Sequence, residues 1–349
     1  MYKEPNRQCS FFGSMIYERI IPESHFLKQL SKAVDFSFIN GLCADLYCQD
    51  NGRAGWEPAL MFKVVFLQFL YDISDRQVEE QIRYNLLFKW FIGIEADELP
   101  PDYSCLSKFR SRLGAERFKN IFNTIVGLAQ DKGFISERLT IIDSTHIEAK
   151  VDLFRLSKEY KESGEDRSYI DRNSPDPDAR IGRKSKKKSF YGYKTHTGLD
   201  SDSEIITACE VTPGNETDGD KLPALIRGHP HEVTADKAYD SNDNHEYLKG
   251  ENIRSSIIIK KNRTNEDVIG LADPQSQRER PKIEHKFAEL KNYHGLKRSR
   301  YWGLERVTIQ CLISCIVVNC KRMVKLASGI LNPKTIVTLE EVLVKPAVA

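Results

Sequence analysis

The sequence lacks the features that would direct it to a membrane or a secreted compartment. Its opening residues, MYKEPNRQCSFFGSM, contain no apolar run after a basic segment, so we expect no secretory signal. The longest apolar stretch, VTIQCLISCIVV at 307–318, is shorter than the ~20 residues that a membrane-spanning helix needs. We therefore expect a buried helix there, no membrane contact and a cytoplasmic location.

The eight cysteines do not form a metal or redox motif. No two are spaced as C-x-x-C, and Cys311, Cys315 and Cys320 share the apolar helix. Free thiols on such a helix behave as small hydrophobic groups. This usage indicates reduced, buried cysteines and cytosolic conditions, and it argues against a disulfide framework or a zinc site.

Low-complexity tracts and internal repeats are also missing from the 349 residues, of which 40% are hydrophobic. A chain of this length normally exceeds one hydrophobic core, so we expect two domains. The net charge is only +2, but the cations are clustered. Residues 181–194 hold six Lys/Arg and no acid, and residues 277–306 hold nine Lys/Arg against four acids, so 9 − 4 = +5. These clusters predict a local surface that binds polyanions.

The first ~135 residues predict an all-helical domain of about five helices. Pro58 lies in the first turn of a segment whose apolar residues follow the helical period. Ser74 and Gly93 mark the two ends of the next predicted helix. Further helical segments lie at 102–114 and 116–133.

After Gly133 the pattern predicts strands alternating with helices, which is typical of an α/β fold with a mixed five-stranded sheet flanked by helices. The segment 153–180 is polar, and its last part, SPDPDAR at 174–180, is expected to form a loop. We expect a helical domain at 1–135, a catalytic domain at 136–325 and a C-terminal tail at 326–349. Strands are expected within 138–150, 189–214 (two strands joined by a turn), 229–241 and 253–260, with a helix at 243–252.

Two aspartates follow predicted strands. Asp143 ends the apolar run LTII, and Asp236 ends EVTA. In open α/β sheets, ligands gather beyond the carboxyl ends of the strands, so both residues occupy the usual place for an active site. An aspartate at a strand end is more often a cap or turn residue, and neither is informative alone.

A third acid, Glu284, lies on a predicted helix among cations. On a helical projection Arg280, Glu284 and Lys291 fall within an arc of about 40°, and an apolar stripe lies about 70° away. That stripe consists of Ile283, Phe287 and Leu290. The polar face can point into the cleft at the strand ends, or it can be a solvated face with an Arg280–Glu284 ion pair worth a few tenths of a kcal/mol. Helix geometry alone leaves both interpretations open.

Carboxylates among cations have a specific chemical use. Mg²⁺ takes oxygen ligands, and a pair of ions about 3.5–4 Å apart activates the attacking oxygen and stabilises the leaving oxygen in phosphodiester displacement. Mn²⁺ suits the same ligands. The surrounding Lys and Arg residues bind the phosphate backbone. This combination predicts a nuclease or a DNA-joining enzyme.

The motifs, taken in order, resemble those of the DDE transposases of bacterial insertion sequences, in the IS-five and IS-eleven-eighty-two neighbourhood of the IS-four superfamily. The resemblance covers nearly the whole chain, and the segment from GRAGWEPALM to PPDYSCLSKFR (52–110) resembles the InsH-type helical domain. The matching segments are IIDSTHIEA (141–149), SFYGYKTHTGLD (189–200), TADKAYDS (234–241), Arg280-x3-Glu284-x6-Lys291 and GLKRSRYWGLERV (295–307). One departure is Gln277, where the family signature has tyrosine.

The resemblance implies a ribonuclease H-like catalytic fold in which Asp143, Asp236 and Glu284 are the catalytic residues and bind two Mg²⁺ ions, with Mn²⁺ also suitable. It implies cleavage at transposon ends, followed by attack of the freed 3′-hydroxyl on target DNA. Arg280 and Lys291 would contact DNA near the cleaved phosphate. The helical domain would recognise terminal inverted repeats, and a homodimer would bring two DNA ends together in the bacterial nucleoid.

Further DNA contacts are expected around the basic clusters, each with a structural alternative. The strand residues Lys194 and His196 line the DNA channel or lie on a solvated edge, and the run at 183–188 contacts phosphate or is a solvated loop. The other candidates are Lys186, Lys187, Lys188, Arg298, Arg300 and Tyr301. His146 approaches the metals or is simply hydrogen-bonded, and Arg76, Trp90 and Arg110 pack helices or read DNA.

Two other functions fit the same residues. One is a ribonuclease H-like nuclease that cuts without joining. The other is a repurposed transposase that only binds DNA, which Gln277 mildly favours. A pure binding protein gains nothing from carboxylates in a basic groove, so the three acids favour an enzyme.

Overall fold

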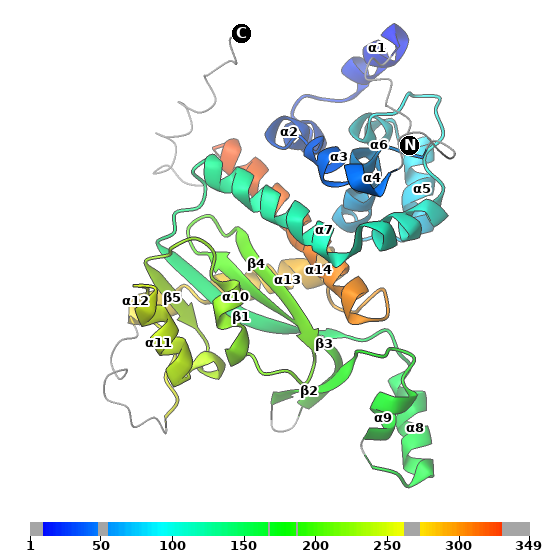
Figure 1. Cartoon of the computed structure of the whole chain (residues 1–349). Helices are drawn as coiled ribbons and strands as arrows, with labels where there is room; N and C mark the ends of the chain where they lie inside the picture. The colour runs from blue at the N-terminus through cyan, green and yellow to red at the C-terminus, as the bar shows by residue number, and fades with distance from the viewer. Residues whose placement is uncertain (1–9, 48–54, 167, 186–187, 262–272, 330–349) are drawn as a thin grey trace. The chain divides into compact units, whose positions relative to one another are not determined.

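The computed structural model describes residues 10–47, 55–166, 168–185, 188–261 and 273–329 (Figure 1). The chain divides into two compact units: unit 1 comprises residues 1–134 and 316–349, and unit 2 comprises residues 135–315. Most of the expected C-terminal tail, from residue 330 onward, lies outside the described residues.

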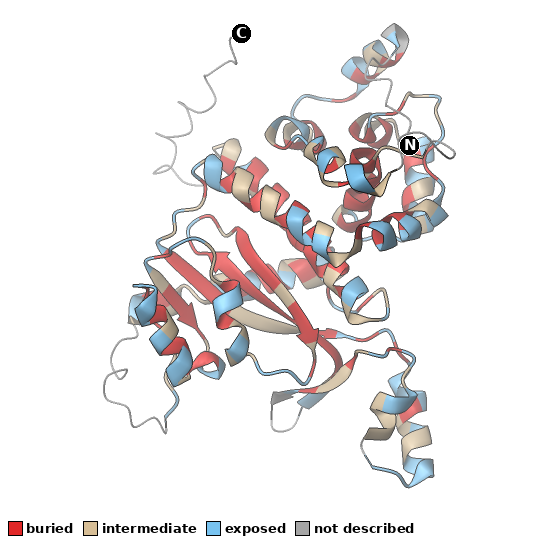
Figure 2. Cartoon of the chain, viewed as in Figure 1, coloured by how far each residue is buried: buried red, intermediate tan, exposed pale blue. Residues whose placement is uncertain are grey.

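Unit 1 is helical, as predicted. Its first 134 residues contain seven α-helices within the described ranges, more than the five expected from the sequence. They are α1 (Phe11–Ile20), α2 (Phe26–Ala33), α3 (Phe38–Leu42), α4 (Pro58–Leu70), α5 (Asp75–Tyr84), α6 (Leu86–Ile92) and α7 (Tyr103–Asp131). An aromatic core holds them together, in which the ring of Phe36 lies 5.5 Å from that of Phe62 and 5.6 Å from that of Phe66. Figure 2 shows these inner helix faces as buried.

One helix of unit 1 is divided where the sequence predicted continuity. The predicted ends are confirmed, because Ser74 caps α5 in a capping box with Gln77, and Gly93 ends α6 in a left-handed conformation. Between them Asn85 adopts an extended backbone, and its side chain accepts hydrogen bonds from the amides of Leu87 and Phe88. The expectation of one helix was therefore wrong: Asn85 ends α5 and caps α6.

Unit 2 contains a mixed sheet with one strand more than predicted. The strands are β1 (Leu139–Glu148), β2 (Arg180–Ser185), β3 (Lys188–Asp200), β4 (Ile206–Pro213), β5 (Glu232–Ala235) and β6 (Arg254–Ser255). Their order is β2-β3-β1-β5-β6, with β4 also paired to β3. Strand β1 is antiparallel to β3 and parallel to β5. The strands expected after Gly133 are confirmed, and β2 is the additional strand.

The polar segment 153–180 contains two helices that the sequence did not predict, and the expected loop SPDPDAR leads into β2, which begins at Arg180. The two helices are α8 (Leu153–Ser163) and α9 (Ser168–Asn173). Leu156 is the one residue of α8 whose side chain is buried, and Phe154 is 84% exposed. So little apolar burial leaves a weak helical pattern, which explains why the sequence did not reveal α8.

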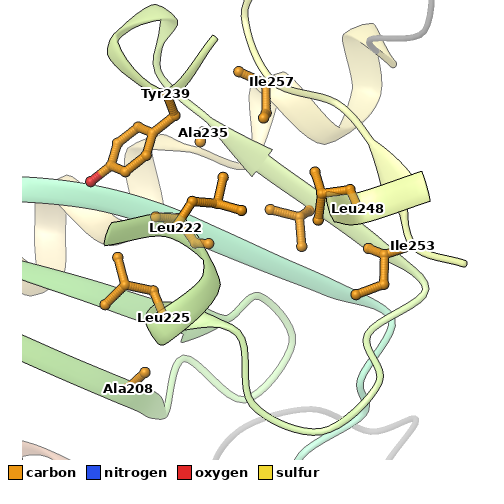
Figure 3. Packing of buried hydrophobic residues seen from close by; sticks show 10 residues of the cluster. Ala208, Leu222, Leu225, Ala235, Tyr239, Leu248, Ile253 and Ile257 are labelled. Carbon is orange, nitrogen blue, oxygen red and sulfur yellow. The ribbon is translucent and has the colours of Figure 1, made fainter. Parts of the chain in front are cut away.

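Helices cover both faces of the sheet in unit 2. Figure 1 shows α10 (Leu222–Leu225) and α11 (Asn242–Gly250) in front of the strands and α13 (Pro281–Tyr293) behind them. The short helix α12 (Pro274–Arg278) precedes α13. The front face packs around a cluster of buried residues from β1, β4, β5, α10 and α11 (Figure 3). That cluster contains Ile142, Ala208, Leu222, Leu225, Val233, Ala235, Tyr239, Leu248, Ile253 and Ile257.

The long apolar helix α14 (Leu304–Ala327) is a core helix. It is long and apolar enough to cross a membrane, but 83% of its most apolar window is buried inside the protein. Cys311, Cys315 and Cys320 are fully buried free thiols, as predicted. Burial raises the pKa of the Cys311 and Cys320 thiols, so they remain protonated hydrophobic groups.

Candidate active site

Asp143 and Asp236 lie side by side where the parallel pairing of β1 with β5 ends. Asp236 directly follows β5, as expected, but the expectation that Asp143 ends its strand was wrong: β1 continues to Glu148 and pairs Asp143 with Thr197 of β3. The register of β1 and β5 ends with the pair Ile142 and Ala235, and each aspartate is the next residue of its chain. Neighbouring residues of parallel strands point to the same face of a sheet, and consecutive residues alternate. Both carboxylates therefore lie on the face opposite the Ile142 cluster, which is the α13 face.

The guanidinium of Arg280 connects the two carboxylates. Arg280 is the N-cap of α13; its Nη2 lies 3.6 Å from Oδ2 of Asp143, and its Nη1 lies 3.9 Å from Oδ1 of Asp236. The side chains of Arg280 and Asp143 are only 16% and 20% exposed. The solvated-face interpretation of this residue is therefore wrong: Arg280 points to the strand ends instead of pairing with Glu284.

The electrostatic balance at Asp143 is unfavourable for its charge. Burial, together with the nearby charges of Asp236 and Asp218, raises the pKa of Asp143 to about 6. The amide of Ser144, which donates to Oδ1 at 2.8 Å, and the charge of Arg280 lower that pKa without cancelling the effect of burial. One arginine thus serves two carboxylates, and the site gains from an additional cation.

Glu284 lies one helical turn beyond Arg280 and is exposed. The predicted apolar stripe of the helix is confirmed, since Ile283, Phe287 and Leu290 are buried. Among the residues that the structure describes, no three His, Cys, Asp or Glu side chains lie close enough to hold a metal ion. The structure brings two of the three predicted acids together, and the role of Glu284 as third ligand stays a prediction.

Comparison with known families decides what kind of site this is. Residues 15–112 match a model described as "Transposase domain (DUF772)", and residues 135–320, more than half of the chain, match one described as "Transposase DDE domain". The chain belongs to the DDE transposase family. This transposase is therefore an enzyme that acts on DNA, and DNA transposition is its function.

A solved structure also matches, at a low level of similarity. It is the cryo-EM structure of the piggyBac transposase synaptic complex with hairpin DNA, with 12% sequence identity and a TM-score of 0.36. The match covers 95% of this chain and 84% of that one. A TM-score in that range carries no weight for function, and the family assignment rests on the two sequence models.

DDE transposase domains use divalent metal ions, and the residues of this transposase fit such an ion by their chemistry. Asp143 and Asp236 supply hard carboxylate oxygens from adjacent strands, which is the ligand type that Mg²⁺ and Mn²⁺ prefer. The pKa of Asp143, raised to about 6 by burial, shows a carboxylate whose charge is incompletely balanced. The buried Nε of Arg280 has no hydrogen-bond partner among the described residues; as a donor it suits an anion such as a phosphate rather than the metal ion.

The loop that follows Asp236 is fixed by buried polar residues that sequence reasoning missed. Asp236 caps the short 3-10 helix Lys237–Tyr239. Asp240 accepts from the amide of Lys260 at 2.8 Å and lies 2.9 Å from Nε2 of His245, whose Nδ1 lies 2.9 Å from Oγ of Ser255. In the sequence, the only sign of this network was an aspartate and a histidine, Asp240 and His245, at a predicted helix with one side packed against the protein.

A second missed residue is Asp218, in the loop before α10. It accepts hydrogen bonds from Oγ of Ser144 at 2.9 Å and from Nζ of Lys194 at 2.8 Å. His196 is fully buried, with Nε2 2.9 Å from Oγ1 of Thr212. Lys194 is largely buried, and His196 has no accessible surface in this structure. Contact of these two residues with DNA has no direct support here and stays a prediction.

The remaining predicted DNA contacts have varied settings. The guanidinium of Arg298 donates to the carbonyl oxygens of Ala149 and Val151, and so joins the loop before α14 to the end of β1. The Arg300 carbonyl accepts from Nζ of Lys150 at 3.3 Å. Tyr301 is half-buried. The contacts of Arg298 and Arg300 link the loop before α14 to the residues that follow β1. The predicted contacts of these residues with DNA stay predictions.

Four other basic candidates and His146 remain to be placed in the catalytic unit. Lys188 is exposed at the start of β3, and Lys291 is half-buried in the last turn of α13. The predicted contacts Lys186 and Lys187 lie outside the described residues. The ring of His146 lies 5.1 Å from that of Phe190.

Within unit 1, the residues left open between packing and DNA reading make intramolecular contacts. Arg110 is buried and pairs with Asp75 at 2.5 Å, which is a packing role. The guanidinium of Arg76 lies 4.9 Å from the ring centre of Tyr103. Nζ of Lys28 lies 5.7 Å from the ring centre of Trp90. Arg76 and Trp90 keep partial exposure, so their roles in DNA recognition stay open.

Proposed function

We propose that this transposase cleaves DNA at the ends of an insertion sequence and joins the freed ends to target DNA, with divalent ions bound at Asp143 and Asp236. The observation that carries the proposal is the convergence of these two carboxylates where the parallel pairing of β1 with β5 ends, with one guanidinium between them. In the first step, water attacks a phosphodiester and leaves a 3′-hydroxyl. In the second, that hydroxyl attacks a target phosphodiester and displaces another 3′-oxygen.

The residues divide these tasks by position. Asp143 and Asp236 would hold the ions, two Mg²⁺ or Mn²⁺, and Glu284 would supply a third carboxylate from the first turn of α13. When bound, the ions supply activation of the attacking oxygen and stabilisation of the leaving oxygen. Arg280 gains a second task, because its guanidinium can donate to a DNA phosphate once metal charge balances the carboxylates. Lys291, on the same polar face, would contact the backbone nearby.

The finer assignments follow from the order of the motifs. The segments 141–149, 234–241 and 280–291 support membership of the IS-five and IS-eleven-eighty-two group, with an InsH-type helical domain that recognises terminal inverted repeats. Joining two ends in one event needs two recognition surfaces, which supports a homodimer on DNA. Such an enzyme would act on the bacterial nucleoid.

A cleavage assay tests the proposal. Purified full-length protein is incubated with end-containing DNA and Mg²⁺, and wild type is compared with Asp143→Ala, Glu284→Ala and the control Glu246→Gln, an exposed acid on α11. We expect wild type and the control to cut and join, and the two alanine variants to fail. Equal cleavage by all four proteins would sink the assignment of the acids.

The same assay separates the two rival functions. Cleavage without joined product would identify a nuclease, and DNA binding without metal-dependent cleavage would identify a repurposed binding protein. The DNA that flanks the gene gives an independent check, because an insertion sequence carries short terminal inverted repeats and a duplicated target site.

A further inference from the structure

Beneath the candidate site, on the opposite face of the sheet, lies a second polar group built around Asp218. Strands β1 and β3 pair Ser144 with His196 and His146 with Lys194. Directly paired residues share a face, and side chains alternate along a strand. These four side chains therefore lie on the face opposite Asp143, although Ser144 is the residue that follows Asp143 in the chain.

The contacts of Asp218 satisfy both of its oxygens. Oδ2 accepts from Oγ of Ser144 at 2.9 Å, and Oδ1 accepts from Nζ of Lys194 at 2.8 Å. Nδ1 of the buried His196 lies 3.9 Å from Oδ1. Nζ of Lys194 also donates to the carbonyl of Glu216 at 2.8 Å. With Asp218 18% exposed and Lys194 15% exposed, this ion pair is largely removed from water.

Ser144 links this group to the metal site. Its backbone amide donates to Oδ1 of Asp143 at 2.8 Å, while its hydroxyl donates to Asp218. Fixing the hydroxyl on one face of the sheet restricts the amide that orients the carboxylate on the other face.

We infer that Asp218 is a positioning residue for Asp143, acting through Ser144, and that Lys194 is its counter-ion. This inference rests on the proposed function, since it assigns Asp143 as a metal ligand. Asp218 holds the part of β1 that carries Asp143, and Lys194 balances the charge of Asp218 so that the pair can be buried. Groups that orient metal ligands through hydrogen bonds commonly change metal affinity by tenfold or more when removed.

The test is a Mn²⁺ titration of the full-length protein, followed by the electron paramagnetic resonance signal of free Mn²⁺. The variants are Asp218→Asn, which removes the charge, and Ser144→Ala, which removes only the hydroxyl link. The control is Asp220→Asn, an exposed acid in the same loop that accepts from the hydroxyl of Thr217. Thermal unfolding by circular dichroism verifies that each variant is folded.

We expect the dissociation constant for Mn²⁺ to rise about tenfold in Asp218→Asn and about threefold in Ser144→Ala, which loses a single hydrogen bond. The control should match wild type. If Asp218→Asn does not fold, Ser144→Ala decides alone, because it leaves the Asp218–Lys194 pair intact. Unchanged Mn²⁺ affinity in the folded variants, or an equal loss in the control, would overturn the inference.

The titration also separates this inference from the proposed function. A wild-type protein that binds Mn²⁺ through Asp143 but cuts no DNA would refute the proposed function and leave the positioning role standing on the affinity ratios. A wild-type protein that binds no Mn²⁺ would overturn both. Normal cleavage together with wild-type affinity in Asp218→Asn and Ser144→Ala would overturn the positioning role alone.

Discussion

The two faces of the sheet around Asp143 and Ser144 of β1 differ in how their carboxylates are balanced. On the α13 face, Asp143 and Asp236 share one guanidinium at 3.6 and 3.9 Å, longer than a hydrogen bond. On the reverse face, Asp218 receives two hydrogen bonds below 3.0 Å and has its own lysine. Buried charges are normally paired, so the incompletely balanced face is the one built to receive a cation.

Asp240, in the loop that follows Asp236, resembles Asp218 more than Asp143 in the way its carboxylate oxygens are paired. The side chain of Asp240 is fully buried, and its two oxygens are occupied by His245 and by the amide of Lys260. Full hydrogen bonding of a buried carboxylate stabilises the fold, whereas the incompletely balanced charge of Asp143 lowers stability and serves function. The comparison predicts that substitutions on the α13 face change activity and substitutions on the reverse face change stability or geometry.

The largest effect is expected from removing either acid of the α13 face. Asp143→Asn and Asp236→Asn should lower the rate of Mg²⁺-dependent DNA cleavage by roughly a thousandfold, because an incomplete metal site forfeits several kcal/mol of stabilisation of the transition state. Single-turnover kinetics on end-containing DNA measure this loss. A matched Glu246→Gln variant should retain the wild-type rate, and a loss of less than tenfold in both site variants would contradict the comparison.

Next in size is the effect of Asp240→Asn on stability. An asparagine removes the negative charge that both the ring of His245 and the amide of Lys260 face, and so replaces charge-assisted hydrogen bonds by weaker neutral ones in a buried site. We expect the free energy of unfolding to fall by about 2–3 kcal/mol, as measured by urea denaturation. The exposed neighbour Asp243 gives the control Asp243→Asn, which should be near neutral. Full stability in Asp240→Asn would show that this network does not hold the loop.

A smaller effect, an increase in the free energy of unfolding, is expected from Asp143→Asn in the metal-free protein. Burial raises the pKa of Asp143 from 3.8 to about 6, so its stabilising protonation is complete below about pH 4 and is lost as the pH rises through 6. Asparagine carries no charge to desolvate. At pH 7.5 with a chelator, the variant should be more stable than wild type by on the order of 2 kcal/mol, and the gain should vanish near pH 4.

Urea denaturation across that pH range measures the difference. The same gain at every pH would show that it comes from packing and not from ionisation of Asp143.

The smallest effect concerns Arg280, whose charge lowers the pKa of Asp143. In Arg280→Gln that pKa should rise further above its usual range, which moves the acid limb of the pH–rate profile to higher pH at subsaturating Mg²⁺. We expect cleavage to fall about tenfold near pH 6, corresponding to a shift of roughly one unit, and by less at pH 8. A loss by the same factor at every pH would indicate that Arg280 acts only on DNA.

The sequence predicts the α13 face better than the reverse face, for physical reasons. Asp143 and Asp236 each follow an apolar run, and Ile283, Phe287 and Leu290 mark the buried side of α13, so local patterns place them. The continuation of β1 beyond Asp143 to Glu148 depends on pairing with β3 and was not predicted. Asp218 lies in a loop without periodicity, and its partners depend on the register of β1 with β3. That register is a long-range property that no local pattern contains.

Other differences have the same origin. Lys194 belongs to a strand whose polar residues suggested a solvated or DNA-facing edge, but its counter-ion comes from the loop between β4 and α10. β2 carries Arg180 and Arg183 among few apolar residues, so its pairing with β3 rather than its composition makes it a strand. The position of Glu284 in the sequence fits the family signature, while its exposure in the structure leaves its ligand role to experiment.

The central claim is that Asp143 binds the divalent ion that supports DNA cleavage, and a Asp143→Cys variant tests it most directly. A thiolate is a poor ligand for Mg²⁺ and a better one for a softer ion such as Mn²⁺. We predict that this variant does not cleave end-containing DNA in Mg²⁺ and regains cleavage in Mn²⁺, while wild type cleaves in both. Wild-type cleavage by the variant in Mg²⁺, or an equal deficit in both ions, would contradict the claim.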